Sequence, residues 1–430
     1  MHITAEHVEK YNITAPRYTS YPTAPAWKDG FPEADYRAVL SGLVGPLSIY
    51  IHIPFCESMC YYCGCNVTIR KQKPEVADEY IDFLSKEIRL ASNGQRVKQL
   101  HIGGGTPNFL SEKQLRRLTE VIHQNFKLDP DAEISIELDP RHPIHFGLLK
   151  ELGFNRLSMG IQDFNPEVQK AINRIQPFDL VSHLMNEIRR LNFHSVNFDL
   201  IYGLPHQHSL DDTIQKTISL KPDRIALYSY AHVPWLKPHQ NLMPSDAFPS
   251  DNQKIELFLQ ARNQLIDGGY LAIAMDHFAL KTDSLATGPL YRNFMGYTLH
   301  PTDDFVGFGV SSIGFCSNHY VQNTRDLKEY YDRLSRDELP VSRGLKLSQD
   351  DIIRQWTINQ MMCHFKIDKS EFQRKFSLNF NDYFDMEFDP DLVKQNQSHV
   401  VATELGRLFV RNICVKFDAY LLAQKFSKTV

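Results

Sequence analysis

The sequence predicts an α/β fold, namely a partial (β/α) barrel of the TIM type that follows an extended N-terminal arm and precedes a helical C-terminal domain. Short apolar runs alternate with amphipathic stretches from about residue 47 to residue 280. Most of these runs are continuously apolar, which favours parallel strands covered by helices on both faces. A rhythm of roughly 30 to 40 residues per unit indicates about six or seven right-handed βα repeats.

Local patterns predict the individual elements. Runs rich in Ile, Leu, Val and Phe predict strands at residues 47–54, 99–103, 133–138, 156–161, 196–202, 224–230 and 271–275. Helical spacing of apolar residues predicts helices at residues 75–91, 112–125, 144–152, 179–191, 210–220 and 252–267. Ser111, Ser209 and Ser250 precede three of these helices close to acidic residues, as capping residues do. The active site of such a scaffold lies at the carboxyl ends of the strands.

The two ends of the chain do not follow the barrel pattern. Residues 1–46 contain several prolines and a tyrosine-rich segment at residues 17–21, which predicts an extended arm laid over the rest of the protein. From about residue 345 the pattern becomes helical, with little strand signal. We therefore expect an arm at residues 1–46, a barrel at residues 47–340 and a helical domain at residues 341–430.

Composition and charge argue against several classes of function. The net charge of −4 and the pI of about 6.5 give no basic footprint for nucleic acid. The first residues lack the basic and apolar regions of a secretion signal, and no apolar run approaches the roughly 18 residues that would span a bilayer. We expect a cytoplasmic protein without membrane insertion, and a monomer because no self-association motif is evident.

The cysteines indicate an iron-sulfur cluster. Of the seven cysteines in the chain, Cys56, Cys60, Cys63 and Cys65 lie together directly after the first predicted strand. The CxxxCxxC spacing places three thiolates on one tight loop, which suits a [4Fe-4S] cluster with one iron left open. Structural zinc normally takes two separated ligand pairs, so it fits this loop poorly. Cys65 stays ambiguous, although we expect it to pack nearby and not to bind metal.

An open iron of this kind can bind S-adenosylmethionine (SAM) through the amino and carboxylate groups of its methionine part. An electron from the reduced cluster then breaks a C–S bond and gives methionine and a 5′-deoxyadenosyl radical. Residues 103–107 (GGGTP) follow the next strand, where exposed backbone N–H groups can bind the amino-acid end of SAM. Polar residues at the following strand ends, Glu137, Gln162 and Asp199, together with Arg174, suit its ribose and adenine.

The cysteine loop resembles the signature of the radical SAM superfamily, and Tyr62 is similar to the aromatic residue that those enzymes place near adenine. Within the superfamily, the chain resembles the oxygen-independent coproporphyrinogen III oxidases over nearly its whole length. The motifs that carry this resemblance are residues 16–23 (PRYTSYPT), 56–65 (CESMCYYCGC), 103–107 (GGGTP), 156–164 (RLSMGIQDF), 199–205 (DLIYGLP), 230–232 (YAH), 275–278 (MDHF) and 411–414 (RNIC).

The resemblance implies a barrel of the radical SAM type, a helical C-terminal domain, one [4Fe-4S] cluster and two SAM molecules. It also implies conversion of two propionates of coproporphyrinogen III to vinyl groups in haem biosynthesis, with electrons from a donor such as flavodoxin or ferredoxin. Cys56, Cys60 and Cys63 would hold the cluster, and Arg17 and Arg292 are candidates to bind substrate carboxylates. The implied SAM contacts are Tyr50, Tyr62, Gly104, Gly105, Thr106, Glu137, Gln162, Arg174, Asp199, Ala231 and Ile313.

One residue departs from the family pattern. The family usually has Gln where this chain has Met295, within residues 292–297 (RNFMGY), so a donor and acceptor near the second SAM is lost. Two alternatives stay open: a haem chaperone, which shares the scaffold and the cysteine loop, and a radical SAM methyltransferase that acts on a haem-like or other large substrate, which Met295 keeps open. Haem chaperones typically lack the N-terminal arm and have a His-Asn-x-x-Tyr-Trp motif at this position, and both differences favour the oxidase.

Overall fold

The computed structural model of the protein describes residues 4–71, 75–299, 304–421 and 426–429. Its main feature is a sheet of 13 strands in the order β1-β17-β16-β15-β14-β2-β5-β6-β7-β8-β9-β11-β10. The strands from β14 to β9 in this order are all parallel to their neighbours. They are β14 (Asp304–Phe308), β2 (Leu47–Ile53), β5 (Arg96–Gly104), β6 (Lys127–Leu138), β7 (Arg156–Gln162), β8 (Ser195–Tyr202) and β9 (Arg224–Ser229).

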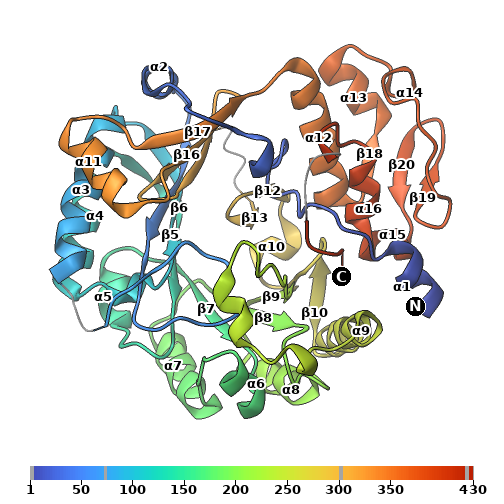
Figure 1. Ribbon diagram of the computed structural model, residues 1–430, viewed down its shortest axis with the longest axis horizontal. Helices are drawn as coiled ribbons and strands as arrows, with labels where there is room; N and C mark the ends of the chain where they lie inside the picture. The colour runs from blue at the N-terminus through green and yellow to red at the C-terminus, as the bar shows by residue number, and fades with distance from the viewer. Residues whose placement is uncertain (1–3, 72–74, 300–303, 422–425, 430) are drawn as a thin grey trace.

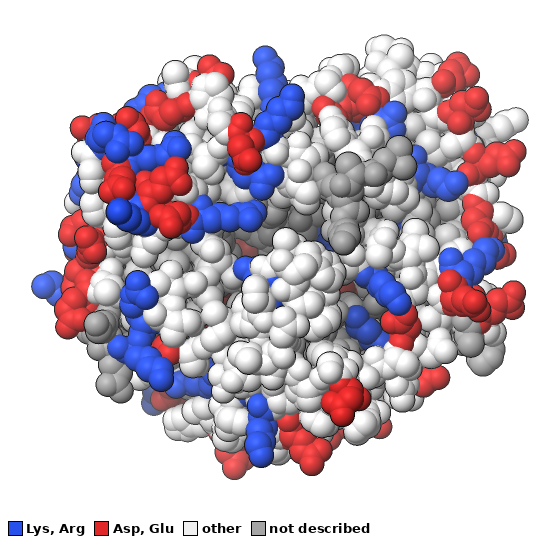
Figure 2. Space-filling view, viewed as in Figure 1, with Lys and Arg blue, Asp and Glu red and all other residues white. Residues whose placement is uncertain are grey.

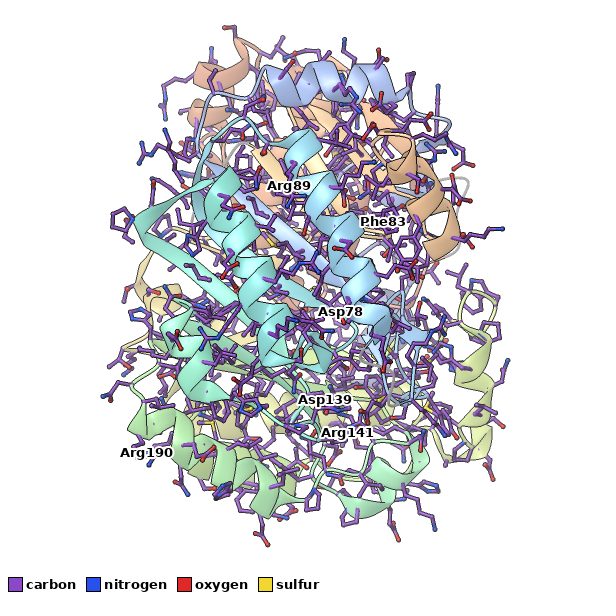
Figure 3. The ribbon with its side chains drawn as sticks, turned by 90° about the vertical axis from the view of Figure 1, so that its left-hand side faces the viewer. Asp78, Phe83, Arg89, Asp139, Arg141 and Arg190 are labelled. Atoms are coloured by element: carbon purple, nitrogen blue, oxygen red, sulfur yellow. The ribbon has the colours of Figure 1, made fainter. Side chains whose placement is uncertain are left out.

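Helices cover the outer face of these strands, as expected for βα repeats. Figure 3 shows α3 and α4 side by side over the sheet. Ser111 and Ser250 form capping boxes at the starts of α4 and α9, whereas α8 has Leu210 at its N-cap and Ser209 only accepts a bond from the Asp211 N–H. The helices are α3 (Glu75–Ala91), α4 (Glu112–Asn125), α5 (Phe146–Glu151), α6 (Pro166–Ala171), α7 (Phe178–Arg190), α8 (Asp211–Leu220), α9 (Asp251–Asp267) and α11 (Leu327–Ser335).

The last expected strand of the barrel, residues 271–275, is not a parallel strand. It forms β10 (Tyr270–Ile273), which makes an antiparallel hairpin with β11 (His277–Leu280) at the edge of the sheet. The three residues between these strands are too few for the crossover that parallel pairing requires. The seventh parallel strand is β14, which lies on the other side of β2 and continues into β15 (Ile313–Cys316), β16 (His319–Asn323) and β17 (Val341–Lys346), all antiparallel.

The N-terminal arm is only partly extended. It contains α1 (Ala5–Tyr11), α2 (Glu33–Ser41) and the short edge strand β1 (Lys28–Asp29). Arg411 fastens the arm by donating from Nε to the Pro16 carbonyl at 2.9 Å, while its Nη1 donates to the Lys428 carbonyl at 2.9 Å. The two ends of the described chain thus lie on the same side of the molecule (Figure 1).

The C-terminal region is helical and includes a small three-stranded sheet. Its helices are α12 (Gln349–His364), α13 (Lys369–Phe376), α14 (Phe380–Tyr383), α15 (Glu404–Leu408) and α16 (Val410–Val415), and its strands are β18 (Lys366–Asp368), β19 (Val393–Gln395) and β20 (His399–Ala402). β17 extends the main sheet beyond residue 340, and the proposed division into three parts stays a prediction. No helix in the described residues is long and apolar enough to cross a membrane.

Shorter elements complete the described chain. They are α10 (Ser284–Thr287), β3 (Phe55–Cys56), β4 (Thr68–Ile69), β12 (Tyr291–Asn293), β13 (Gly296–Thr298) and the 3₁₀ turns η1 (Ala24–Ala26), η2 (Pro107–Phe109), η3 (Pro238–Leu242) and η4 (Ser245–Ala247).

A buried carboxyl joins α3 to the C-terminal half of the sheet. Glu87 accepts bonds from the Gly309 N–H at 2.8 Å, Asn323 Nδ2 at 2.6 Å and the Tyr330 hydroxyl at 2.6 Å. Burial raises the pKa of Glu87 from 4.5 to about 7, although the bond from Tyr330 opposes this shift.

We predict that Glu87→Gln destabilises the protein and removes part of its pH dependence. The NH₂ group of the new glutamine would face groups that also donate hydrogen bonds, and this mismatch costs about 1–3 kcal/mol of stability. Between pH 4.5 and pH 7 the unfolded wild type releases a proton that the folded state retains, so its free energy of unfolding falls with rising pH by on the order of 3 kcal/mol. Chemical unfolding across this range checks both effects, with the exposed Glu79→Gln on α3 as control. Equal pH slopes for wild type and Glu87→Gln would contradict the prediction.

Candidate active site

The cysteine loop leaves the sheet at the end of β2 and is fixed at both of its ends. β3 pairs with β4, and the Thr68 N–H donates to the Pro54 carbonyl at 2.7 Å. The Arg70 N–H donates to the Cys56 carbonyl at 2.9 Å, which closes the loop. The loop therefore projects into a cavity of about 270 Å³ at the carboxyl ends of the parallel strands.

Each of the three predicted ligand sulfurs accepts a hydrogen bond. The Thr106 hydroxyl lies 3.3 Å from Cys56 Sγ, Arg141 Nη2 lies 3.3 Å from Cys60 Sγ, and the Cys65 N–H lies 3.4 Å from Cys63 Sγ. Sulfur is a weak acceptor as a thiol, but hydrogen bonds to a charged acceptor are markedly stronger. The donors are therefore arranged for thiolates, the form of cysteine that binds metal.

The donor set of this loop, three cysteine sulfurs, suits a [4Fe-4S] cluster, which takes cysteine thiolates as its ligands. Among the described residues, no three Cys, His, Asp or Glu side chains converge on one ion position. A [4Fe-4S] cluster is held with each thiolate on a different iron. Cys63 has a pKa lowered to about 7 by hydrogen bonding from Cys65, against the effect of burial. Burial raises the pKa of Cys56 to about 12, so metal binding must displace its proton.

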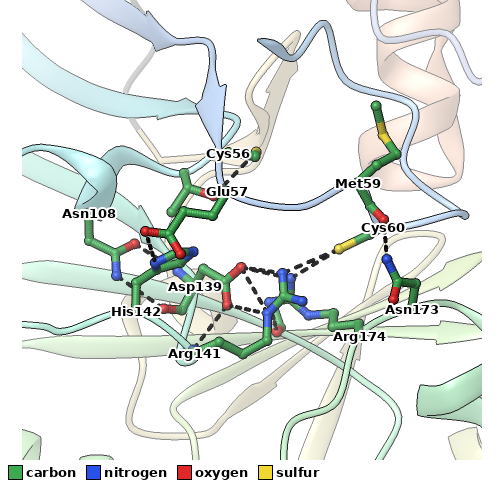
Figure 4. A network of polar contacts seen from close by, with 12 residues as sticks. Cys56, Glu57, Met59, Cys60, Asn108, Asp139, Arg141, His142, Asn173 and Arg174 are labelled. Atoms are coloured by element: carbon green, nitrogen blue, oxygen red, sulfur yellow. Dashed lines mark hydrogen bonds and ion pairs between the residues drawn. The ribbon is translucent and has the colours of Figure 1, made fainter. Parts of the chain in front are cut away.

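A buried ionic network supports the second cysteine (Figure 4). Asp139 Oδ2 lies 2.7 Å from Arg141 Nη2 and 3.1 Å from Arg174 Nη1, and both arginines reach toward Cys60 Sγ. Burial disfavours the charge on Asp139, but the two guanidinium groups outweigh it and hold the pKa of Asp139 well below its usual range. One carboxylate therefore keeps two cations in place beside a single sulfur.

The glycines after β5 allow the strand end to lie against the cysteine loop. Gly104 has φ +117°, and a Cβ on Gly105 would lie 2.8 Å from the Phe55 carbonyl oxygen and 3.0 Å from Cys56 Sγ. The expected free N–H donors are absent here, because these groups donate within the chain. The Gly104 N–H donates to Glu137 Oε2 at 3.0 Å, the Gly105 N–H to Ile53 and the Thr106 N–H to Phe55.

Two carboxylates line the same cavity, Glu137 on β6 and Asp199 on β8, the two strands on either side of β7. Desolvation disfavours the charge on Glu137, whose side chain is 43% exposed, but the hydrogen bond and charge of His101, whose Nε2 lies 3.1 Å away, outweigh it and lower its pKa. Burial and the charge of Glu137 raise the pKa of Asp199 to about 6, while Asn197 donates to it at 2.8 Å. Both groups are suited to accept bonds from hydroxyls.

The structure brings together most of the residues that the sequence predicts for the site. Those that line the cavity are Cys56, Cys60, Cys63, Tyr62, Gly104, Gly105, Thr106, Glu137, Gln162, Arg174 and Asp199. Three others lie outside its lining. Tyr50 stacks on His101 and bonds to His52, the Ala231 carbonyl accepts from Gln240, and Ile313 packs in an apolar cluster around Trp27 and Tyr320. The roles of all these residues stay predictions.

Several lining residues were missed by the sequence reasoning, namely Met59, Asp139, Arg141, Ser158 and Tyr228. Asp139 directly follows β6, so the rule that placed Glu137 at a strand end could have found it. Nothing in the sequence indicates that Arg141 reaches Cys60.

Comparisons with known proteins agree with this site. Residues 50–219 match the family model of the Radical SAM superfamily, and residues 347–409 match that of the HemN C-terminal domain. Fold and site together define a radical SAM enzyme, a class that works with a [4Fe-4S] cluster and SAM.

Similarity over the full chain identifies the family. The chain is 43% identical to the oxygen-independent coproporphyrinogen III oxidase of Synechocystis sp., over 99% of this chain and 98% of that protein. It is 41% identical to the Escherichia coli K12 enzyme, over 98% and 97% of the two chains. The solved structure of coproporphyrinogen III oxidase (HemN) from E. coli superposes with a TM-score of 0.90, at 41% identity over 94% of this chain and 98% of that one. The chain belongs to the oxygen-independent coproporphyrinogen III oxidase family.

We predict that Cys63→Ala and Cys65→Ala distinguish a cysteine that binds the cluster from one that only lies beside it. Cys63→Ala should lose most of the bound iron, because a cluster held by two thiolates is not retained. Cys65→Ala should retain it, since the backbone N–H of residue 65 still donates to Cys63 when the thiol is removed. Iron and sulfide per chain after anaerobic reconstitution give the answer. Loss of iron in Cys65→Ala alone would assign the third ligand to Cys65 instead.

Proposed function

We propose that this protein oxidatively decarboxylates two propionate side chains of coproporphyrinogen III to vinyl groups, yielding protoporphyrinogen IX in haem biosynthesis. The proposal rests on one cavity. Three cysteine sulfurs, each of which accepts a hydrogen bond, line this cavity together with Glu137, Gln162 and Asp199. The relatives that match over the full chain are named for the same reaction. A monomeric cytoplasmic enzyme that takes electrons from a flavodoxin or ferredoxin is part of this proposal.

When bound, the cluster and two SAM molecules supply carbon-centred radicals that can each take a hydrogen atom from the β-carbon of a propionate. Transfer of one further electron from each substrate radical to an external electron acceptor, together with loss of CO₂, would then leave the vinyl group. The protein needs no general base for this change, because the β-hydrogen leaves as an atom and the carboxylate leaves as CO₂. Its tasks are to hold the iron through Cys56, Cys60 and Cys63 and to orient SAM through Glu137, Gln162 and Asp199.

Arg17 and Arg292 are the proposed partners of substrate carboxylates. Arg17 lies in the arm and Arg292 in the hairpin of β12 and β13. The two are in contact, because Arg292 Nη2 donates to the Arg17 carbonyl at 3.0 Å. Arg292 stacks over the Tyr297 ring at 4.7 Å, and its buried Nε has no hydrogen-bond partner among the described residues. A guanidinium with a spare donor is suited to a carboxylate.

Met295 lies at the tip of this hairpin. Its backbone N–H donates to Asn293 Oδ1 at 2.9 Å, so this bond does not use the side chain at position 295, where a thioether replaces the family's glutamine. The full two-step reaction stays part of the proposal because the relatives that match over the full chain are named as coproporphyrinogen III oxidases.

The product of an anaerobic reaction tests this proposal. Reconstituted protein with dithionite, SAM and coproporphyrinogen III should give two successive mass losses, each of CO₂ plus two hydrogens. A gain of methyl mass would favour a methyltransferase, and retention of haem without turnover would favour a haem chaperone. Either result would replace the proposed reaction.

We predict that SAM binding weakens as the pH falls through about 6. Burial and then Glu137 raise the pKa of Asp199 to about 6, so protonation below this value removes a hydroxyl acceptor from the cavity. Asp199→Asn should bind SAM about tenfold more weakly, the equivalent of about 1.4 kcal/mol, and its affinity should vary less across this range. Equilibrium dialysis with labelled SAM measures both. An unchanged affinity in Asp199→Asn would remove Asp199 from the SAM site.

A further inference from the structure

A histidine at the start of β11 is held by a neighbouring carboxylate. His277 Nδ1 lies 2.7 Å from Asp276 Oδ1. Burial disfavours the charge on Asp276, but the hydrogen bond and charge of His277, together with the charges of Arg292 and Arg17, outweigh it and lower the pKa of Asp276. A carboxylate only accepts hydrogen bonds, so the shared proton is on Nδ1 of the imidazole. In the neutral ring, Nε2 is then an acceptor.

This second ring nitrogen has no hydrogen-bond partner among the residues that the structure describes, although the side chain of His277 is only 12% exposed. Nε2 faces Gly296, where an added Cβ would lie 4.0 Å away, so no side chain approaches from that position. The hydroxyl of the adjacent Tyr297 donates to the Met362 carbonyl at 3.2 Å instead. Since polar groups in protected positions are normally paired, Nε2 is suited to a donor that a ligand brings.

Two tyrosine rings fix the direction of the imidazole. Its centroid lies 4.9 Å from that of Tyr297 and 5.8 Å from that of Tyr228, and both contacts are edge to face. Tyr228 lines the cavity of the cysteine loop, whereas His277 lines a second cavity of about 400 Å³. Cavities of roughly 300–1,000 Å³ are typical of small-molecule sites. The free acceptor is therefore oriented in advance, one side chain away from the cluster cavity.

The surroundings of this acceptor fit a large ring that bears carboxylates. Phe258, Phe278 and Phe365 line the second cavity, which lies between α9, the hairpin of β10 and β11, and the C-terminal region. Arg292 stacks on the same Tyr297 ring that His277 contacts. Figure 1 shows β12 and β13 between the barrel and the C-terminal region, and Figure 2 shows Lys and Arg beside recesses in the middle of this face. Apolar walls, cations and one acceptor thus lie together.

We propose that His277 Nε2 accepts a hydrogen bond from a pyrrole N–H of the tetrapyrrole substrate, and that Asp276 is the positioning residue that keeps the ring in the accepting tautomer. This rests on the proposed function, which makes coproporphyrinogen III the substrate. The N–H groups of a porphyrinogen point into the centre of its macrocycle, whereas the carboxylates lie at the edge. A propionate that reacts beside Asp199 therefore places the N–H groups further from the cluster, beyond Tyr228, where His277 lies.

Two substitutions separate the acceptor from the bond to Asp276. The amide of His277→Asn can keep the bond to Asp276 but does not reach the position of Nε2, whereas the longer side chain of His277→Gln brings an amide oxygen there. His277→Asn should bind coproporphyrinogen III about tenfold more weakly, and His277→Gln should recover most of the affinity. His194→Asn, at an exposed position directly before β8, is the control and should change nothing. Iron content and circular dichroism show that each variant is intact.

A ligand without N–H groups provides the matched comparison. Palladium(II) coproporphyrin III has the same carboxylates, but the metal occupies all of its pyrrole nitrogens and takes no axial ligand. Its luminescence reports binding directly, and its displacement under anaerobic conditions gives the affinity for coproporphyrinogen III without turnover. His277→Asn should leave the affinity for the palladium complex unchanged.

Equal affinities of His277→Asn and His277→Gln for coproporphyrinogen III would overturn the proposed acceptor. A parallel loss of affinity for the palladium complex would also overturn it and would assign His277 to the substrate carboxylates. Weaker SAM binding by His277→Asn in equilibrium dialysis would assign the residue to SAM instead. Wild-type protein that binds coproporphyrinogen III but forms no vinyl product would overturn the proposed function and leave the binding contact in place.

Discussion

The site depends on the close packing of the cysteine loop against the end of β5. Gly105 lies where any side chain would collide with the Phe55 carbonyl and with Cys56, and the N–H groups of residues 104–106 are used to hold the loop and Glu137 in place. The triple glycine is therefore first a packing requirement of the protein itself. Because β2, β5 and β6 meet at this point, the positions of the first sulfur, of Thr106 and of Glu137 are set together.

The charged groups of the cavity are organised around this packing. The Asp139 carboxylate pairs with both Arg141 and Arg174, and its charge offsets the repulsion between the two guanidinium groups beside Cys60. On the opposite side, Glu137 and Asp199 share one cavity, and the raised pKa of Asp199 reflects burial and the proximity of the second carboxylate. The cavity thus has guanidinium groups beside Cys60 and carboxylates at Glu137 and Asp199, which suits a ligand that is itself a zwitterion.

Sequence patterns predicted six of the seven parallel strands because these carry nearly continuous apolar runs, but they missed β14, which has only five residues. They failed where strands are antiparallel and half buried, as in β15 and β17, since alternate exposure leaves no apolar run. In the site, residues adjacent to a strand end were predictable, whereas Arg141 was not, because its contact with Cys60 joins residues far apart in the chain. The prediction of free N–H donors after β5 was wrong for the same reason, because the groups that accept these hydrogen bonds lie on other elements.

The position of β14 beside β2 has a consequence for biosynthesis. β2 carries the cysteine loop and is made early, but its neighbour on one side is made only when residues 304–308 leave the ribosome. The parallel sheet cannot be completed before then, so the nascent chain presents its three cysteines for a long stretch of translation with one flank uncovered. Completion of the sheet beside the strand that carries the cysteine loop thus waits for a single late strand.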